Sequence, residues 1–185
     1  HLLADEGINT EFVGSVNGNS SGMTSTQHEG HGGYTVLGIQ NLTVASRIST
    51  YQPDVVLLMI GTNDMSQGNT FAAGQFDTLI GTIEGVILEN GERTKLIVAQ
   101  IVPRRSNNTT TIAYNLEVVR IVGEYQNLGY PVSLVDMYSA LDPALDLADS
   151  VHPNLAGYEK MAATWLPAIE QVVPEPATMS LLAFG

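Results

Sequence analysis

Two strongly apolar segments, residues 55–60 and 96–102, constrain the fold of this chain more than any other feature. Each has the length of a strand, and strands that are apolar on both faces are typical of parallel sheets covered by helices on both sides. Residues 132–135 predict a third strand of this kind, and residues 11–15 are a shorter strand candidate. The segments therefore favour a parallel sheet at the centre of the fold.

Segments with helical spacing of apolar residues alternate with these strands. Their apolar positions are Leu37, Ile39, Leu42, Val44 and Ile48; Phe76, Leu79, Ile80, Ile83, Val86 and Ile87; Ile112, Leu116, Val119 and Val122; and Leu155, Tyr158, Met161, Ala162, Trp165, Leu166 and Ile169. Asn90 and Gly91 predict the end of the second helix, and Pro167 predicts a kink in the last. The alternation predicts an α/β fold, a three-layer α/β/α sandwich around a parallel sheet.

Composition limits the classes of function. A chain of 185 residues suits one domain with a sizeable core. It carries seven Lys and Arg against nineteen Asp and Glu, a formal net charge of −12, which leaves no basic surface for nucleic acid or an anionic membrane. The absence of Cys from the sequence excludes disulfides, thiolate metal sites and a Cys nucleophile.

Asp149 and His152 precede the last predicted helix and place a carboxylate three residues before an imidazole. On a turn at a helix entrance, two side chains with this spacing can reach each other. A neutral imidazole can then take a proton from a hydroxyl while the carboxylate holds its other nitrogen. A capping Asp beside a surface His is the alternative interpretation of the same pair.

Two further segments offer donors for an oxyanion. Asn63 follows the strand predicted at residues 55–60, and its amide can donate to a developing negative charge, although Asn is also a common turn residue. Gly33 lies in the polar loop 14–33, where its backbone N–H can approach a ligand closely. Sites in parallel sheets form where the chain leaves the carboxyl ends of strands, so we expect these segments and the Asp-His pair to meet at one edge.

Other polar residues near these segments allow different chemistry. His28, Glu29 and His31 in the same polar loop are a candidate metal site, although they lack the helical His-Glu-x-x-His pattern. Arg104 and Arg105 follow the strand at residues 96–102 and either line a cleft or are solvated charges.

Together the three segments resemble the SGNH hydrolases, also called the GDSL esterase/lipase superfamily. Residues 61–64 resemble the family's third block, which supplies an Asn, residues 149–153 its fifth, which supplies Asp and His, and residues 28–35 its second, which supplies a Gly. The resemblance covers about residues 11–170 and implies a flavodoxin-like sandwich and catalysis through an acyl-enzyme, without cofactor or metal. It assigns His152 as base, Asp149 as its orienting carboxylate, and Asn63 and Gly33 as oxyanion hole, with Gly30 as the alternative to Gly33.

The same resemblance indicates what residues 1–185 lack. The family's first block, Gly-Asp-Ser-Leu or a variant, carries the nucleophilic Ser after an interior strand of the sheet. The sequence contains no such block, and the serines in its first loops, Ser15, Ser20, Ser21 and Ser25, do not follow a strand-to-helix elbow. Residues 1–7 read as the end of a helix. We therefore expect the first central strand and the nucleophile to lie outside this chain, and the chain alone to be inactive.

Residues 173–185 differ from the predicted hydrolase domain, residues 1–172. They begin with a Pro-Glu-Pro sequence and continue as an apolar run. This segment resembles the start of a PEP-CTERM sorting signal, which implies exosortase-type sorting machinery as a partner and a secreted or envelope-associated protein of a Gram-negative bacterium. We expect it to lie outside the folded domain and to be dispensable for folding. A Pro-rich tail after the last helix is the alternative.

The sequence thus predicts a serine esterase of the SGNH type that hydrolyses acyl esters, with acetyl as the expected acyl group. Residues 12–15 and 28–31 further resemble acetylxylan-esterase-like members, which implies acetylated polysaccharide as substrate. The alternative is a non-catalytic, envelope-associated carbohydrate-binding or surface protein derived from the same fold. An intact Gly-Asp-Ser block upstream favours the enzyme, and a replaced Ser favours the binding protein.

Overall fold

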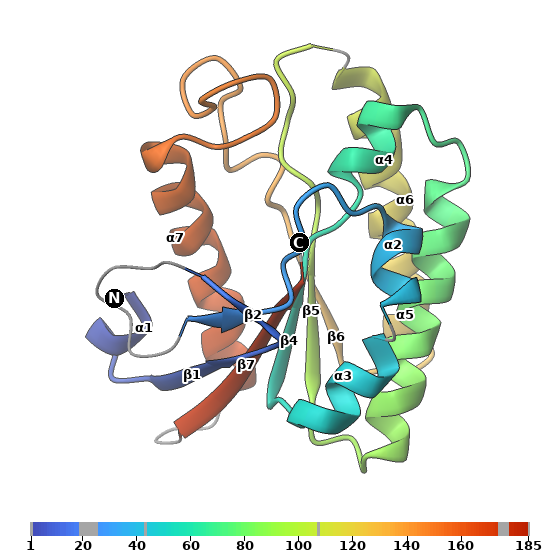
Figure 1. Cartoon of the computed structure of the whole chain (residues 1–185), viewed down its shortest axis with the longest axis vertical. Helices are drawn as coiled ribbons and strands as arrows, with labels where there is room; N and C mark the ends of the chain where they lie inside the picture. The colour runs from blue at the N-terminus through green and yellow to red at the C-terminus, as the bar shows by residue number, and fades with distance from the viewer. Residues whose placement is uncertain (1, 19–25, 43, 107, 174–177, 185) are drawn as a thin grey trace.

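The computed structural model shows a five-stranded sheet with helices on both faces (Figure 1). It describes residues 2–18, 26–42, 44–106, 108–173 and 178–184. The strand order is β1-β7-β4-β5-β6, and all neighbouring strands are parallel. The predicted α/β sandwich around a parallel sheet is confirmed.

The strands of this sheet are β1 (Asn9–Val13), β4 (Val55–Leu58), β5 (Lys95–Ala99), β6 (Val132–Val135) and β7 (Thr178–Phe184), while β2 (Val16–Asn17) and β3 (Gln27–His28) form a small antiparallel pair. The helices are α1 (Leu2–Asp5), α2 (Val36–Asn41), α3 (Val44–Tyr51), α4 (Thr62–Gln67), α5 (Ala72–Glu89), α6 (Asn108–Asn127) and α7 (Leu155–Val172). The single helix expected around residues 37–48 is thus two helices, α2 and α3. Within the described ranges, no helix is both long enough and apolar enough to cross a membrane.

Successive residues of the strands face opposite layers of the sandwich. Val56 and Leu58 of β4 belong to the core under α2, α3, α5 and α6, whereas Val55 and Leu57 belong to the core under α7. All four side chains are buried. A strand covered on both faces needs apolar residues at every position, which explains the continuous apolar sequence.

β7 occupies an interior position of the sheet, between β1 and β4 (Figure 1). Leu181 pairs with Phe12 of β1 on one side and with Val55 of β4 on the other. Leu181 and its neighbour Leu182 are completely buried, on opposite faces of the sheet. The expectation that the segment after residue 173 lies outside the folded domain is therefore wrong for residues 178–184.

β7 takes an interior position of the sheet, which is the kind of position that the resemblance implies for the family's first strand. An interior strand pairs its backbone N–H and C=O groups with two neighbours, so the edges of β1 and β4 are satisfied here. The apolar sequence of β7 suits this place because an interior strand is buried on both faces.

The buried face of α6 differs from the predicted one. Ile112, Leu116 and Val119 were assigned to it by their spacing, but they are 44%, 63% and 39% exposed. The helix instead buries Thr111, Tyr114, Asn115, Val118, Ile121 and Val122. The Asn115 side chain both accepts a hydrogen bond from the Ile101 N–H and donates one to its carbonyl, each at 2.9 Å. Polar side chains with backbone partners therefore take core positions that a pattern of apolar residues does not reveal.

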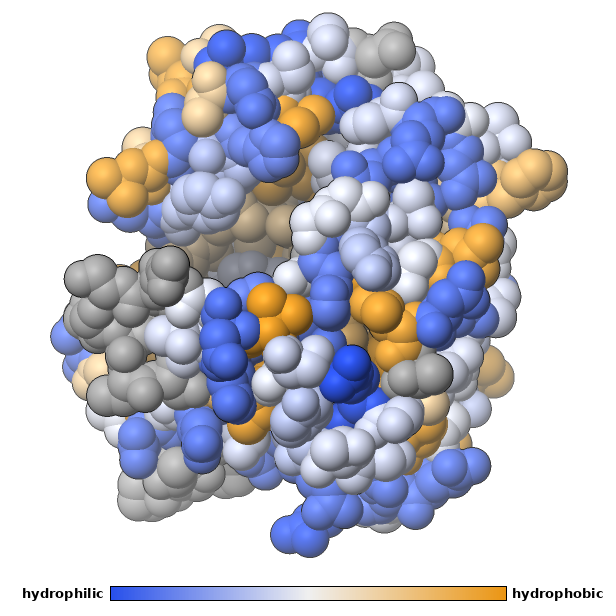
Figure 2. Space-filling model, viewed as in Figure 1, coloured by the Kyte–Doolittle hydropathy of each residue, from blue (hydrophilic) through white to orange (hydrophobic). Residues whose placement is uncertain are grey.

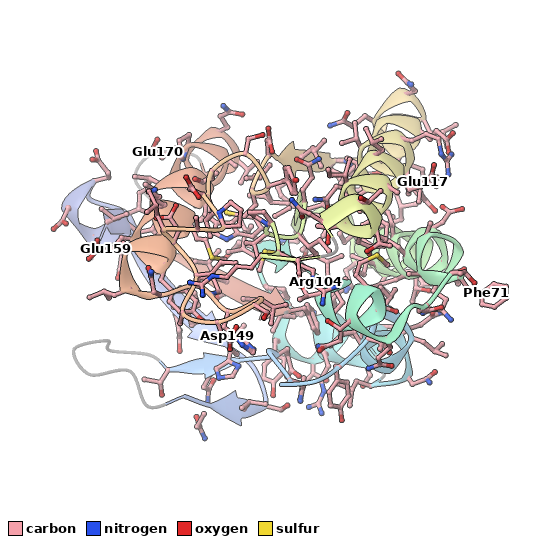
Figure 3. All side chains as sticks on the ribbon, turned by 90° about the horizontal axis from the view of Figure 1, so that it is seen from above. Phe71, Arg104, Glu117, Asp149, Glu159 and Glu170 are labelled. Atoms are coloured by element: carbon pink, nitrogen blue, oxygen red, sulfur yellow. The ribbon has the colours of Figure 1, made fainter. Side chains whose placement is uncertain are left out.

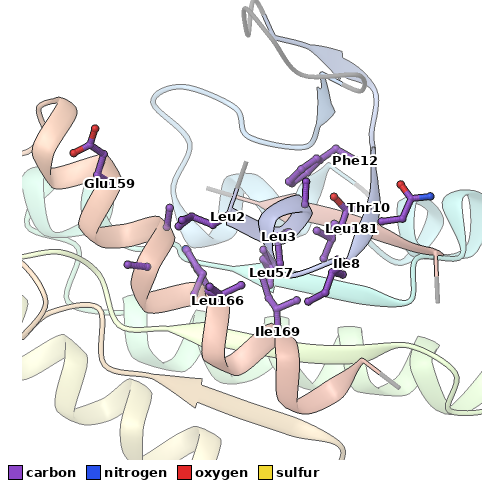
Figure 4. Close-up of a pocket in the computed structure, with 16 residues that line it drawn as sticks. Leu2, Leu3, Ile8, Thr10, Phe12, Leu57, Glu159, Leu166, Ile169 and Leu181 are labelled. Atoms are coloured by element: carbon purple, nitrogen blue, oxygen red, sulfur yellow. The ribbon is translucent and has the colours of Figure 1, made fainter. Parts of the chain in front are cut away.

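A cavity of about 1080 Å³ opens between α1, β1 and α7 (Figures 2 and 4). Its lining is mostly apolar and includes Leu57 and Leu181 from the sheet and Trp165 from α7. Trp165 also packs against the core on this face, as its place in the apolar pattern predicted. None of the residues predicted for catalysis lines this cavity, so it is separate from the candidate site.

Candidate active site

Asp149 and His152 lie in the loop that leads from β6 to α7. Oδ2 of Asp149 is 2.7 Å from Nδ1 of His152, and Oδ1 accepts the backbone N–H groups of Val151 and His152 at 2.8 Å. These two N–H donors, and then the His152 ring, hold the pKa of Asp149 well below its usual value. The carboxylate is therefore ionised at neutral pH and in contact with the imidazole, as the sequence predicted.

The outer nitrogen of this imidazole is open to solvent. The side chain of His152 is 71% exposed and that of Asp149 is 58% exposed. Because Nδ1 faces the carboxylate, Nε2 is the atom that can take up a proton. No hydroxyl group in the described part of the chain hydrogen-bonds to His152. The pair is thus an oriented base whose proton donor is not among these residues.

Asn63 lies in the first turn of α4, directly beyond β4. Its side-chain amide donates to the Tyr34 carbonyl at 2.9 Å, which joins it to the loop that contains Gly33. Gly33 is exposed and has a φ of +83°, in the left-handed region that favours glycine. The Asn63 side chain is a primary amide, so it has a second N–H besides the one used on Tyr34. The two predicted oxyanion donors therefore lie on segments that touch each other.

Asp64 of α4 also connects its helix to the segment after the Gly33 loop, through buried hydrogen bonds. It is completely buried, and its Oδ2 accepts the Val36 N–H at the start of α2 at 2.9 Å. Its Oδ1 accepts a hydrogen bond from the Asn69 side chain at 2.7 Å. The Asp64 carboxylate thus fixes α4 against the N-terminus of α2.

A second imidazole–carboxylate contact holds the loop before Gly33. Glu29 is completely buried, and its Oε2 lies 3.0 Å from Nε2 of His31 and 3.8 Å from Nε of Arg47. Ser15 donates to the same carboxylate from its N–H at 2.6 Å and its hydroxyl at 3.1 Å. Burial alone raises the pKa of Glu29, but the hydrogen bonds from His31 and Ser15 and the charge of Arg47 outweigh it and lower the pKa.

The contacts of Glu29 also concern Ser15, one of the early serines that the sequence does not favour as the nucleophile. The Ser15 hydroxyl is directed to Glu29 and not to His152, so Ser15 is not placed to be activated by the candidate base. The other early serines, Ser20, Ser21 and Ser25, lie outside the described residues.

The metal hypothesis for the His28–His31 loop gains no support. Nδ1 of His28 accepts the N–H of Gly30 at 3.0 Å, while His31 is engaged with Glu29. In the ranges that the structure describes, no three His, Asp or Glu side chains are grouped to hold a metal ion.

The loop after β5 runs alongside the loop that carries the Asp-His pair. The N–H of Arg105 donates to the Ser150 carbonyl at 3.1 Å, and its guanidinium donates to two backbone carbonyls within residues 143–147. Arg105 therefore fixes the position of that loop and is more than a solvated charge. Figure 3 looks down on this edge of the sheet, where Arg104 and Asp149 mark the two loops.

The predicted residues form two groups on the carboxyl edge of the sheet. Asp149 and His152 follow β6, while Asn63 and the Gly33 loop adjoin the end of β4. No hydrogen bond between described residues joins the two groups. An edge with a base on one side and amide donors on the other can activate a hydroxyl and stabilise an oxyanion formed between them.

Comparison with known proteins bears on this arrangement. The sequence profile of the GDSL-like lipase/acylhydrolase family matches residues 7–160. The chain belongs to this family. The multidomain esterase of Ruminococcus flavefaciens is 29% identical over 162 aligned residues, which cover 77% of this chain and 20% of that protein. The chain thus spans about a fifth of the length of this relative.

Solved esterases share the fold of this GDSL-family chain. The family 3 carbohydrate esterase of Clostridium thermocellum superposes with a TM-score of 0.80 at 30% identity, covering 92% of this chain and 83% of the esterase. An acetyl esterase, solved as a serine-to-alanine mutant with an acetate ion, has a TM-score of 0.80 at 26% identity, covering 92% and 86% of the two chains. The predicted SGNH resemblance is confirmed.

Sequence reasoning missed the buried carboxylates that support the site. It named Glu29 only as a candidate metal ligand and gave Asp64 no role, yet both bind backbone N–H groups and fix loops at the edge. The only signal for Glu29 was its place between two His residues in a Gly-rich loop.

Proposed function

We propose that this protein is a serine ester hydrolase that removes acetyl groups from carbohydrate, and that its nucleophilic Ser lies outside residues 1–185. One observation carries the proposal, the 2.7 Å contact between Asp149 and His152 with the outer ring nitrogen exposed. An imidazole held in this way, on a GDSL-family fold, is the group that activates a serine hydroxyl.

In the proposed reaction, the Ser oxygen attacks the ester carbonyl carbon while Nε2 of His152 takes the hydroxyl proton. The carbonyl oxygen becomes an oxyanion that accepts hydrogen bonds from the Gly33 N–H and the Asn63 amide. His152 returns the proton to the alcohol oxygen, and the alcohol leaves an acetyl-enzyme. Water then attacks the acetyl carbon while His152 takes its proton, the bond to the Ser oxygen breaks, and His152 passes the proton to that oxygen as acetate leaves. Asp149 stabilises the imidazolium in both halves of the reaction.

The substrate class is supported by the relatives. The two solved structures described above are a carbohydrate esterase and an acetyl esterase, and the aligned curated relative is an esterase of several domains. Acetyl esters on polysaccharide are therefore the substrates to test first, with p-nitrophenyl acetate as a small reference ester.

A chimera tests the proposal. A segment with the strand, Gly-Asp-Ser block and helix that the family resemblance implies is joined ahead of His1, with and without residues 174–185, because β7 occupies the strand position that the graft needs. Acetate release from acetylated xylan is expected from the chimera and not from the chain alone. It is expected to disappear when the grafted Ser, or His152, becomes Ala. Hydrolysis by the chain alone that Ser15→Ala abolishes would contradict the assignment of the nucleophile.

A second candidate function is carbohydrate binding without catalysis. It is favoured by the His152 imidazole, to which no hydroxyl group of the described residues hydrogen-bonds. A folded chimera that binds acetylated xylo-oligosaccharides but releases no acetate would support this alternative.

We also propose that residues 173–185 act in sorting to the cell envelope. The Pro-Glu-Pro sequence supports this role, but residues 178–184 would first have to leave the sheet. A reporter protein that carries this segment, expressed in a bacterium with exosortase, tests it by its processing and location. An unprocessed reporter would leave these residues with a structural role alone.

A further inference from the structure

Arg104 lies on the loop after β5, at the edge of the sheet that carries the candidate site (Figure 3). It is half-buried, and its Nε atom is buried with no hydrogen-bond partner. Its guanidinium forms no ion pair with any Asp or Glu that the structure describes. A buried donor on a charged group costs free energy when it is unpaired, so stability does not explain the position of this side chain.

The backbone that carries this side chain is fixed. The Arg104 N–H donates to Oδ1 of Asn108 at 3.1 Å, and Nδ2 of Asn108 donates to the Tyr138 hydroxyl at 2.6 Å. The neighbouring Arg105 uses its guanidinium on backbone carbonyls of the loop that leads to His152. Of two adjacent arginines, one therefore holds the site together, and the other has no hydrogen-bond partner for its Nε among the described residues.

The location indicates which part of a substrate lies near Arg104. The Arg105 N–H contacts the Ser150 carbonyl, so the Arg104 segment runs directly beside the loop of His152. In the proposed reaction, His152 returns its proton to the leaving alcohol, whereas Asn63 holds the carbonyl oxygen from the other side. The alcohol part of the ester therefore leaves beside the loop of His152, which the Arg104 segment adjoins.

The guanidinium also indicates the chemistry of the ligand. Its parallel N–H donors match the two oxygens of a carboxylate, and such bidentate pairs are stronger than neutral hydrogen bonds. The net charge of −12 repels anions at long range, so recognition of a carboxylate has to come from this local contact.

We propose that Arg104 binds a carboxylate on the alcohol part of the substrate, as carried by a uronic acid residue of an acidic polysaccharide. The inference rests on the proposed esterase function, because that function places the alcohol beside His152. It assigns the protein to acidic, acetylated polysaccharides and gives Arg104 the role of a specificity residue.

Binding to the chain of residues 1–185 tests this inference without any need for turnover. Isothermal titration calorimetry compares a xylo-oligosaccharide that bears glucuronic acid with the unsubstituted oligosaccharide of the same length, and with acetate alone. The acidic sugar is expected to bind about 10-fold to 100-fold more tightly than the neutral one, as a charge-assisted pair implies. Arg104→Met is expected to bring the ratio of the two affinities close to one. Arg104→Lys is expected to give an intermediate ratio, because Lys keeps the positive charge but lacks the two parallel N–H donors.

Arg120→Met is the matched control. Arg120 is half exposed on α6 and pairs with Glu117 and Glu124, so its loss changes the net charge equally and is expected to leave the ratio unchanged. Urea denaturation of each variant shows that it folds.

Each other outcome has a defined meaning. Equal binding of acidic and neutral sugars by the unchanged chain, an unchanged ratio in a folded Arg104→Met variant, or no binding of either sugar would overturn the inference. Acetate binding that depends on Arg104 would overturn it in favour of an anion site on the acyl side. The chimera separately measures hydrolysis of p-nitrophenyl acetate, a neutral ester. If the chimera hydrolyses p-nitrophenyl acetate but the chain binds acidic and neutral sugars equally, only the role of Arg104 is rejected. If the chain prefers the acidic sugar but the chimera hydrolyses no ester, only the esterase function is rejected.

Discussion

Glu84 makes the stability of this protein depend on pH. It lies on α5, is 1% exposed, and neither of its carboxylate oxygens has a hydrogen-bond partner. The groups that face it are Lys95 at the start of β5 and the Tyr125 hydroxyl on α6, and neither hydrogen-bonds to it. Burial raises the pKa of Glu84 from 4.5 to about 7, and the positive charge of Lys95 offsets only part of this effect.

The size and sign of the effect follow from proton linkage. At pH values below 4.5, Glu84 is protonated in the folded and the unfolded chain, so it does not affect the free energy of unfolding. Between pH 4.5 and about 7 the unfolded chain releases the proton and the folded chain keeps it, so the stability falls as the pH rises. At about 1.4 kcal/mol per pKa unit, the loss reaches about 3 kcal/mol near pH 7 and stays constant above it.

Glu84→Gln removes this titration while it keeps the shape of the side chain. Urea denaturation of the variant and of the unchanged chain, at several pH values between about 4 and 9, gives the difference in unfolding free energy at each pH. The variant is expected to gain about 3 kcal/mol relative to the unchanged chain between acid and neutral pH. A Glu84→Gln difference that is the same at every pH would refute the reasoning.

Three further predictions follow from the packing and the candidate site. Leu182→Ala in β7 is expected to lower the unfolding free energy by about 2 to 5 kcal/mol, measured in urea, and a loss below about 1 kcal/mol would mean that β7 is not an interior strand. Gly61→Ala is expected to destabilise the fold strongly, seen as a lower thermal midpoint, because Gly61 has a φ of +126° and a Cβ there would lie 2.4 Å from the Tyr114 ring. In the active chimera, His152→Ala is expected to lower kcat by ~10³-fold or more and Asn63→Ala by ~10²- to 10³-fold. A chimera in which neither change slows acetate release would contradict the assigned roles.

The parts of the fold that sequence reasoning predicted are those that depend on local pattern. β4 and β5 are buried on both faces, and each appears in the sequence as an apolar run. The contact between Asp149 and His152 was predictable because the two residues are three apart on one turn. Asn63 was placed at the carboxyl edge because it directly follows β4.

The parts that were not predicted depend on partners far away in the chain. The apolar sequence of β7 is equally compatible with the start of a membrane segment and with a buried strand, and only its pairing with β1 and β4 distinguishes them. Leu116 fits a helical apolar pattern, but the core side of α6 is set by hydrogen bonds of Asn115 to the loop after β5. Buried polar contacts of this kind leave no periodic signal in a sequence.

The place of β7 in the sheet has a consequence for folding during synthesis on the ribosome. β1 is translated early and β4 follows, yet in the finished sheet the strand that separates them is translated after all the other strands. Until residues 178–184 have been made, the facing edges of β1 and β4 lack the partner that β7 provides in this structure. The pairing of β1 with β7 joins two of the most distant segments of residues 1–185, and contacts between distant segments slow folding.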